Sequence, residues 1–158
     1  MKKLSDNGNT PLRILFVCND NLCRSVMAEY MMRYVVEQTG RQDEFLIDSK
    51  AAHTDDIGSE MYSQARRKLE EKGIPYGHHR ATLISKQDYD KYDILIGMDS
   101  ENIIDMKRFW NQDPDGKIVK LMTFAGEARS VKDPWYTGDF EATYWDLEEG
   151  IRALLSCS

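Results

Sequence analysis

The sequence predicts a small doubly wound α/β domain in which a four-stranded parallel sheet carries helices on both faces. Short apolar runs alternate with amphipathic helical segments along the chain, as in consecutive strand–helix–strand units. The length of 158 residues, with 41% hydrophobic residues, suits one compact domain. We expect this domain over residues 12–158, after a loose leader of turn-forming residues at 1–11. Such a flavodoxin-like sheet binds ligands at the carboxyl ends of its strands.

The first half of the chain predicts two strands and two helices. Residues 13–17 are an apolar, β-branched run that is typical of a buried strand. Over residues 24–39 the apolar positions recur every three or four residues, which indicates an amphipathic helix that stops at Gly40. Residues 45–47 are again apolar and predict the second strand. A second helix is expected over residues 59–72, immediately before a glycine.

The second half repeats the alternation. Residues 93–97 predict a third buried strand, and either Asp99 or Ser100 can cap the helix that follows it. A fourth strand is expected over residues 118–121, after a turn rich in aspartate, proline and glycine. The last helix is expected over residues 140–155, because its apolar residues fall on one stripe.

Charge and composition exclude several function classes. Lys and Arg number 21 and Asp and Glu 27, so the formal charge is −6, which argues against a nucleic-acid binder that neutralises phosphates. No apolar run approaches the ~18 residues of a membrane span, and the N-terminus is polar, so no membrane partner or secretory signal is expected. The three cysteines (Cys18, Cys23 and Cys157) form no metal-binding pattern and are too few for a disulfide scaffold. We therefore expect a cytoplasmic protein without a metal or other cofactor.

The segment over residues 18–25 carries the chemistry that the sequence offers. It leaves the first strand and enters the first helix, where free backbone N–H groups and the helix dipole attract an anion. Cys18 at the mouth of this loop would have its thiolate stabilised, and the thiolate is the nucleophilic form. Arg24 can bind two oxygens of a tetrahedral dianion, and Ser25 can donate a hydrogen bond to the sulfur.

With these residues the chain resembles the low-molecular-weight protein tyrosine phosphatases. The family's loop is C-x-G-N-x-C-R-S-P followed by M-A-E, and here it is matched by Cys18, Asn21, Cys23, Arg24, Ser25 and Met27-Ala28-Glu29. The likeness continues through Asp48-Ser49, Glu71-Lys72-Gly73-Ile74, Asp88-Tyr89, Met98-Asp99-x-x-Asn102 and Asp133-Pro134-Trp135-Tyr136. It spans nearly the whole chain after the leader, so it does not depend on one motif.

The resemblance implies a phosphatase that hydrolyses phosphotyrosine monoesters through a phosphocysteine intermediate. Cys18 would be the nucleophile, Arg24 the clamp on the transition state, and Asp133 the general acid. An Asp-Pro pair considered alone is more often an ordinary turn, and the role of Asp133 follows only from its coexistence with the loop. The expected partner is a phosphotyrosine-containing protein or a small aryl phosphate, and the expected state a monomer or weak homo-oligomer.

The resemblance also assigns residues around the phosphate. The substrate-binding and phosphate-binding residues would be Asn19, Asp20, Asn21, Leu22, Cys23, Ser25, Trp135 and Tyr136. Trp135 and Tyr136 would form an aromatic wall. Ser49 and His79 would support the loop, whereas His53 and His78 receive no role. Cys23 is also expected to protect Cys18 as a reversible disulfide partner.

Asp20, Asn19 and Val26 depart from the family's pattern in the loop and at the start of the helix, and Asn19 replaces a residue that is apolar in many relatives. The family glycine two positions after the nucleophile is Asp20 here, which places a carboxylate on the rim of an anion site. If that carboxylate faces inward it opposes phosphate binding; if it faces solvent it has no effect. Val26 replaces the proline at the start of the helix, at a small cost in preorganisation.

Three other functions remain open at this point. Protein arginine phosphatases share the fold, but they carry a smaller residue in the aromatic wall and a threonine where this chain has Leu22. Arsenate reductases share the loop but need two further relay cysteines, and only Cys157 is available. A weakly active phosphate-binding module is suggested by Asp20. Hydrolysis of p-nitrophenyl phosphate, with a Cys18→Ser control, discriminates a tyrosine phosphatase from an arsenate reductase and from a phosphate-binding module.

Overall fold

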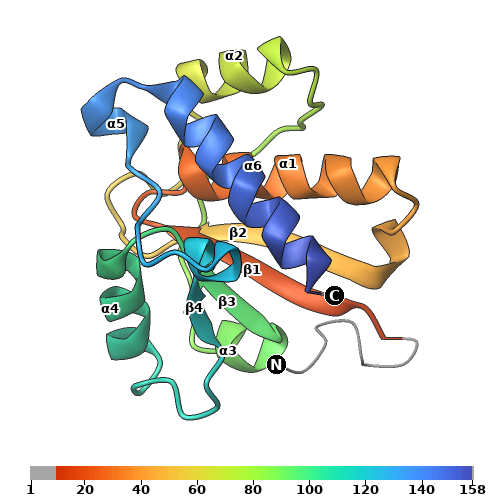
Figure 1. The fold of residues 1–158 in the computed structure, drawn as a ribbon. Helices are drawn as coiled ribbons and strands as arrows, with labels where there is room; N and C mark the ends of the chain where they lie inside the picture. The colour runs from red at the N-terminus through yellow and green to blue at the C-terminus, as the bar shows by residue number, and fades with distance from the viewer. Residues whose placement is uncertain (1–9, 158) are drawn as a thin grey trace.

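The computed structural model describes residues 10–157, whose four strands form a parallel sheet in the order β2-β1-β3-β4 (Figure 1). The strands are β1 (Leu12–Cys18), β2 (Phe45–Ala51), β3 (Ile94–Gly97) and β4 (Ile118–Lys120). Every neighbouring pair is parallel, so the predicted doubly wound sheet is confirmed. Most of the predicted leader, residues 1–9, lies outside the described residues.

Helices connect the strands and cover both faces of the sheet. They are α1 (Arg24–Gln38), α2 (Ser63–Glu71), α3 (Asp88–Lys91), α4 (Ser100–Phe109), α5 (Pro134–Thr137) and α6 (Phe140–Ser156), with the 3-10 helices η1 (Gln42–Glu44) and η2 (Leu121–Ala125). No helix within residues 10–157 is both long and apolar enough to cross a membrane.

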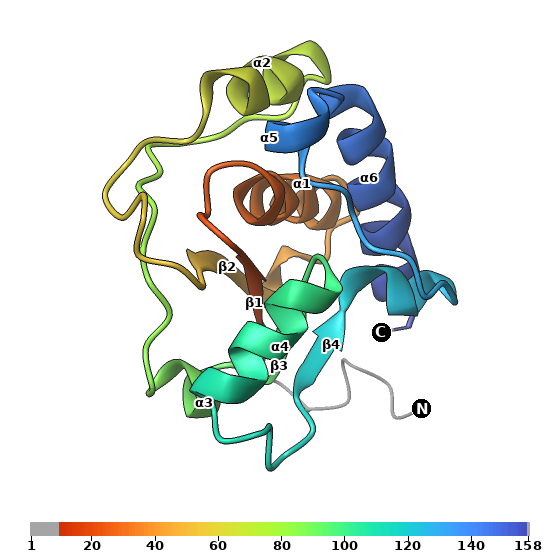
Figure 2. The ribbon, with the colours of Figure 1, turned by 90° about the vertical axis from the view of Figure 1, so that its left-hand side faces the viewer.

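Successive side chains of the central strand β1 enter two hydrophobic clusters on opposite faces. Ile14 and Phe16 belong to the larger cluster, which includes the apolar stripes of α1 and α6. Leu15 and Val17 belong to the smaller one, with residues of α3 and α4. Figure 2 shows α1 and α6 on one side of the sheet and α4 on the other. Because β1 is buried on both faces, its run is continuously apolar.

Two predicted elements differ from the structure by more than one residue at an end. The strand expected over 45–47 continues to Ala51, because β1 supplies backbone partners to residues of β2 that are not apolar. The helix expected from residue 59 begins only at Ser63. The chain before it is extended, since the backbone of Ser59 accepts a hydrogen bond from Ala81 and the next residue forms a bridge to the same segment.

The short helices α3 and α5 were not predicted. Each has four residues, which is too short for an apolar repeat to be visible. A local signal does exist for α5, because Asp133 caps it and Pro134 occupies its first turn, where proline is favoured. The Asp-Pro pair is therefore the start of a helix in this protein.

The carboxyl edge of the sheet brings the loops after β1 and β3 together. β1 ends at Cys18 beside the start of α1, and β3 ends at Gly97 shortly before α4. A Cβ atom on Gly97 would lie 2.8 Å from Met106 Cε and 3.1 Å from Asn102 Cβ. Glycine at this position therefore lets α4 pack closely against β3, which places the first residues of α4 next to the loop after β1.

Candidate active site

The Cys18 sulfur lies at the N-terminal end of α1. It is 3.0 Å from Ser25 Oγ, and it accepts a hydrogen bond from the Ser25 backbone nitrogen at 3.4 Å. Cys23 is the N-cap residue of α1 and makes no side-chain cap hydrogen bond, so no side chain from that position competes for the first N–H groups of the helix. Free N–H groups at a helix N-terminus favour an anion, and they do so here beside the sulfur.

Asn21 holds the loop in its curved shape. Its φ of 60° is left-handed, a conformation that asparagine tolerates better than most residues. The buried side chain donates from Nδ2 to Ser25 Oγ at 2.8 Å and to Ser49 Oγ at 3.0 Å. Its Oδ1 lies 2.8 Å from His79 Nε2. The structure therefore brings together Ser49 and His79, the two residues that were expected to support the loop.

The protonation of His79 follows from these contacts. Both hydrogens of Asn21 Nδ2 are already donated, so Oδ1 is the acceptor and His79 donates its Nε2–H. Burial lowers the pKa of His79, and the positive charge of Arg33 lowers it further. A neutral ring with its hydrogen on Nε2 is consistent with both observations.

Arg24 is buried, with 2% of its surface exposed, and its guanidinium lies between two acidic side chains. Nη1 donates to Asp99 Oδ2 at 2.7 Å and to the backbone oxygen of Val131 at 2.8 Å, while Nη2 lies 3.5 Å from Asp133 Oδ2. Burial by itself would lower the pKa of Arg24, but the Cys18 sulfur and the neighbouring carboxylates outweigh it and raise that pKa. The guanidinium is therefore a permanent positive charge beside the sulfur.

Asp133 stands across the cavity from the loop, as the N-cap residue of α5. Its Oδ1 accepts a hydrogen bond from the Trp135 backbone nitrogen at 3.0 Å, and its Oδ2 faces Arg24. Pro134 follows it in the first turn of α5. These contacts hold the carboxyl at the cavity that Cys18 also lines, so the carboxyl and the sulfur face the same space.

The cavity is lined by the three predicted catalytic residues and by five of the eight predicted binding residues: Cys18, Arg24 and Asp133, with Asn19, Asp20, Leu22, Cys23 and Trp135. Trp135 is 58% exposed and packs edge-on against Tyr62, with ring centroids 5.0 Å apart. Tyr136 is 82% exposed and is not among the lining residues, although it follows Trp135 directly. Of the two residues expected to form an aromatic wall, only Trp135 lines the cavity, and its ring packs against Tyr62.

Three residues of the site were not predicted as site residues. Asp99 and Val131 bind Arg24, and Asn102 donates from Nδ2 to Asn19 Oδ1 at 2.7 Å. Asp99 and Asn102 also form a reciprocal capping box at the start of α4. The cap at Asp99 was visible in the sequence, but nothing local showed that it faces Arg24. Val131 acts through its backbone oxygen and has no signal in the sequence.

The two cysteines of the loop differ in their surroundings. Burial raises the pKa of the Cys23 thiol strongly, and the nearby Cys18 and Asp133 raise it further. Cys23 is thus a protonated, buried thiol, whereas the Cys18 sulfur has a hydrogen-bond donor and lies near a guanidinium. Both are free, as is Cys157 at the C-terminal end of α6.

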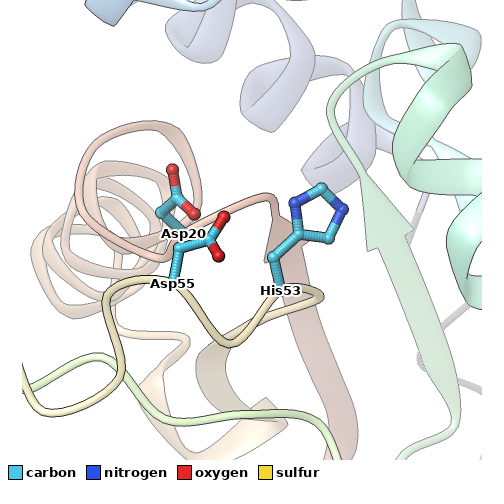
Figure 3. A group of neighbouring side chains, drawn as sticks. All are labelled: Asp20, His53 and Asp55. Carbon is cyan, nitrogen blue, oxygen red and sulfur yellow. The ribbon is translucent and has the colours of Figure 1, made fainter.

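Asp20 lies at the rim of the cavity among other acidic groups. Figure 3 shows its carboxylate beside that of Asp55, with one ring nitrogen of His53 facing both. Asp20 Oδ1 is buried and has no hydrogen-bond partner. Burial raises the pKa of Asp20, the charge of Asp56 raises it further, and His53 lowers it. The Asp20 carboxylate therefore lines the cavity and also faces the charged side chains of residues 53–56.

Among residues 10–157, the two groups of side chains that could hold a metal ion lie in this same region. Asp20, His53 and Asp55 form one group, and His53, Glu101 and Asp105 form the other, with ligand atoms within 4.8 Å of one another. His53 Nε2 lies 2.8 Å from Asp105 Oδ2. The proximity of these carboxylates is compatible with a cation, but the cavity that contains Cys18 and Arg24 suits an anion.

Comparison with known proteins agrees with this geometry. Residues 13–157 match the family model described as low molecular weight phosphotyrosine protein phosphatase. The low molecular weight protein-tyrosine-phosphatase YfkJ of Bacillus subtilis is 31% identical over 92% of this chain and 94% of its own length. The pig (Sus scrofa) low molecular weight phosphotyrosine protein phosphatase is 33% identical over 90% of this chain and 92% of its own.

Solved structures share the fold. The crystal structure of Bacillus subtilis YfkJ superposes with a TM-score of 0.88 at 30% identity and covers 92% of this chain and 93% of that one. A Drosophila arginine phosphatase superposes with a TM-score of 0.84 at 26% identity, with 92% and 96% of the two chains covered. The fold and the site define a protein with an anion-binding loop around a cysteine. The chain belongs to the low molecular weight phosphotyrosine protein phosphatase family.

Replacing Asp20 by asparagine is expected to raise the free energy of unfolding at neutral pH and to lose that effect in acid. Because the pKa of Asp20 is raised in the folded protein, its ionisation disfavours the folded state. That cost is present above the raised pKa and disappears as the pH falls through it, when the group binds its proton. Urea unfolding of wild type and Asp20→Asn at about pH 7 and about pH 4 measures the difference.

Asp43→Asn is the matched control for this experiment, because Asp43 is an exposed carboxylate of η1, remote from the loop. It is expected to change the unfolding free energy little at either pH. Equal stability of wild type and Asp20→Asn at both pH values would show that the Asp20 carboxylate carries no cost in the folded protein.

Proposed function

We propose that this protein is a protein tyrosine phosphatase that hydrolyses phosphotyrosine monoesters through a phosphocysteine intermediate. The observation that carries the proposal is the position of the Cys18 sulfur. It sits at the N-terminus of α1, 3.0 Å from the Ser25 hydroxyl, in a cavity that Arg24 and Asp133 also line. Family membership supports the same reaction, because the matching family model is that of phosphotyrosine protein phosphatases.

In the first step the Cys18 thiolate attacks phosphorus. A P–S bond forms as the ester P–O bond breaks, and Asp133 gives its proton to the departing phenolate oxygen. The N–H groups of the loop and the Arg24 guanidinium stabilise the charge on the equatorial phosphoryl oxygens. Arg24 is held for this task by Asp99 and Val131, so it need not reorganise during the reaction.

In the second step water hydrolyses the phosphocysteine. Asp133, now ionised, takes a proton from the attacking water, whose oxygen forms the new bond to phosphorus. The P–S bond breaks, and the sulfur leaves as a thiolate that the Ser25 hydroxyl and backbone N–H stabilise. Inorganic phosphate is released, and Asp133 is protonated again for the next cycle.

Trp135 and Leu22 support an aromatic substrate. Trp135 presents an exposed ring at the cavity and is braced by Tyr62, which suits stacking against a phenyl ring. Leu22 lines the same cavity with an apolar branched side chain. The second candidate is an arginine phosphatase, which the similarity to the Drosophila structure favours. Comparing hydrolysis of phosphotyrosine and phosphoarginine peptides of equal sequence separates the two.

The position of Cys157 argues against an arsenate reductase. The neighbouring Leu155 accepts a hydrogen bond from Arg41, which follows the C-terminal end of α1, whereas Cys18 lies at the N-terminal end of that helix. A helix of 15 residues separates these ends by about 22 Å.

The free thiols Cys18 and Cys23 also fit the reducing, cytoplasmic setting that we propose for the protein.

Cys18→Ser is expected to abolish hydrolysis of p-nitrophenyl phosphate while leaving the binding of inorganic phosphate measurable by calorimetry. A serine hydroxyl lacks a thiolate of low pKa, but the amide loop and Arg24 remain. Cys157→Ser, which changes a remote thiol in the same way, is the control and is expected to keep wild-type turnover. Substantial residual turnover in Cys18→Ser would exclude the covalent mechanism.

Asp133→Asn is expected to lose about 10²–10⁴-fold in kcat on phenyl phosphate, the usual contribution of general acid catalysis. The loss should be smaller on p-nitrophenyl phosphate, whose leaving group departs without a proton. Asp139→Asn is the matched control, because Asp139 is the exposed N-cap residue of α6 and asparagine caps a helix equally well. If both substrates lose the same factor, Asp133 is not the acid.

The proposed redox role of Cys23 predicts the response to peroxide. Wild type is expected to be inactivated and then recovered by a thiol reductant, through a Cys18–Cys23 disulfide. Cys23→Ser is expected to recover poorly, because the Cys18 sulfenic acid has no partner and is oxidised further. Recovered activity after a fixed peroxide dose is the measurement, with Cys157→Ser as the control. Identical recovery in wild type and Cys23→Ser would leave Cys23 with a packing role only.

A further inference from the structure

Asn19 follows Cys18 directly and lines the same cavity, and the mechanism above does not use its side chain. Both of its acceptor groups are already occupied. The backbone oxygen accepts a hydrogen bond from the His53 backbone nitrogen at 2.9 Å, and Oδ1 accepts from Asn102 Nδ2 at 2.7 Å. The two hydrogens on Asn19 Nδ2 remain, and this atom donates to no group within residues 10–157.

Backbone contacts fix the direction in which the Asn102 amide faces. Its Oδ1 accepts from the backbone nitrogens of Met98 at 3.0 Å and Asp99 at 3.3 Å. A backbone N–H can only donate, so the oxygen of this amide must lie on that side and its nitrogen on the other, toward Asn19. Asn102 is fully buried and is part of the capping box of α4, so a reversed amide would break both contacts.

The orientation of Asn19 follows from that of Asn102. An amide nitrogen can only donate, so Asn19 must turn its oxygen toward Asn102, and its NH₂ group faces the other way. That NH₂ group is open to solvent, because Asp20 Oδ1 is the one buried side-chain nitrogen or oxygen without a partner among the described residues. Since Asn19 lines the cavity, its free hydrogens are available to a substrate that binds there.

The two candidate substrates differ in what they offer to such a donor. Next to phosphorus, phosphotyrosine has its ester oxygen and the face of its ring, and both accept hydrogen bonds. Phosphoarginine has guanidinium nitrogens there, which carry hydrogens and accept no hydrogen bond. An NH₂ group that faces phosphoarginine would therefore place donor against donor, and polar groups left unpaired in a site reduce binding.

We propose that Asn19 is a specificity-determining residue, which favours an aryl phosphate over phosphoarginine because it presents only its NH₂ group to the cavity. Asn102 is the positioning residue that holds Asn19 in this orientation and touches no substrate atom. The inference rests on the proposed function, because it concerns the choice of substrate by that same site.

The other polar groups of the cavity do not make this choice. The Arg24 guanidinium binds phosphoryl oxygens, which both substrates have. Asp20 and Asp133 also line the cavity, and their carboxylates would favour the positively charged guanidinium of phosphoarginine. The NH₂ group of Asn19 is thus the element that acts against phosphoarginine, and specificity commonly needs such an unfavourable contact with the wrong partner.

Asn19→Ala tests the proposal through the ratio of kcat/KM for phosphotyrosine and phosphoarginine peptides of equal sequence. We expect the ratio to fall about tenfold, because phosphotyrosine loses a hydrogen bond and phosphoarginine loses an unfavourable contact. A purely structural effect of the substitution lowers both values together and leaves the ratio unchanged. If phosphoarginine is not turned over, its inhibition constant against p-nitrophenyl phosphate replaces kcat/KM.

Asn102→Asp tests the orientation without changing Asn19. The aspartate still accepts from Met98 and Asp99, but its second oxygen is also an acceptor, so Asn19 must turn its NH₂ group toward it. Oδ1 of Asn19 then faces the cavity, and we expect the ratio to fall below that of Asn19→Ala. In an Asn19→Ala background, where there is no amide to turn, Asn102→Asp is expected to leave the ratio unchanged.

Asn111→Asp is the matched control. Asn111 is an exposed asparagine just beyond the C-terminal end of α4, whereas Asn102 is in the first turn of that helix. The substitution adds the same charge away from the cavity, and the ratio is expected to equal that of wild type.

The outcomes separate the proposal from its alternatives. An unchanged ratio in Asn19→Ala overturns it. An equal fall caused by Asn102→Asp in the presence and absence of the Asn19 amide also overturns it, because the new charge would then act directly. If Asn102→Asp does not fold, Asn19→Ala decides alone. A wild type that does not hydrolyse the phosphotyrosine peptide would instead contradict the proposed function, and the inference with it.

Discussion

The curve of the loop between β1 and α1 depends on the buried side chain of Asn21. The left-handed backbone at this residue turns the chain so that Ser25 returns to the Cys18 sulfur. The amide is held by β2, through Ser49, and by the segment that contains His79. A buried amide hydrogen left without a partner costs about 1–3 kcal/mol, so the loop has a strong preference for this one shape. The anion site is therefore built before any anion arrives, which is the preorganisation that electrostatic catalysis requires.

Arg24 gives the site a second constraint. A guanidinium that is almost fully buried must be paired, and its partners come from two other regions of the chain. Asp99 opens α4, and Asp133 opens α5. The Arg24 side chain thus ties the loop between β1 and α1 to the segment that carries the proposed acid. Asn102 adds a parallel tie from α4 to the loop through Asn19. Cys18, Arg24 and Asp133, for which we propose the roles of nucleophile, clamp and acid, are held in one arrangement because these contacts all meet at the same loop.

The sequence predicted the fold well where the signal was local. Apolar runs identified all four strands, and the spacing of apolar residues identified α1 with its start at Arg24. The prediction failed at the start of α2, where pairing with Ala81 keeps Ser59 in extended backbone despite a helical pattern. It also missed α3 and α5, whose four residues cannot show a repeat. In each case a tertiary contact or a short length outweighed local preference.

For the site, the local sequence was enough to identify the loop after β1. Cys18, Arg24 and Ser25 are close in the chain, and a strand followed directly by a helix leaves few ways to arrange them. The identity of the residues that complete the site depends on tertiary packing. Asp99 is 75 positions from Arg24, Val131 is 107 positions from it, and Asn102 is 83 positions from Asn19. Spacing along the chain carries no information about distance at such separations, because the packing of the parallel sheet alone brings its carboxyl-end loops together.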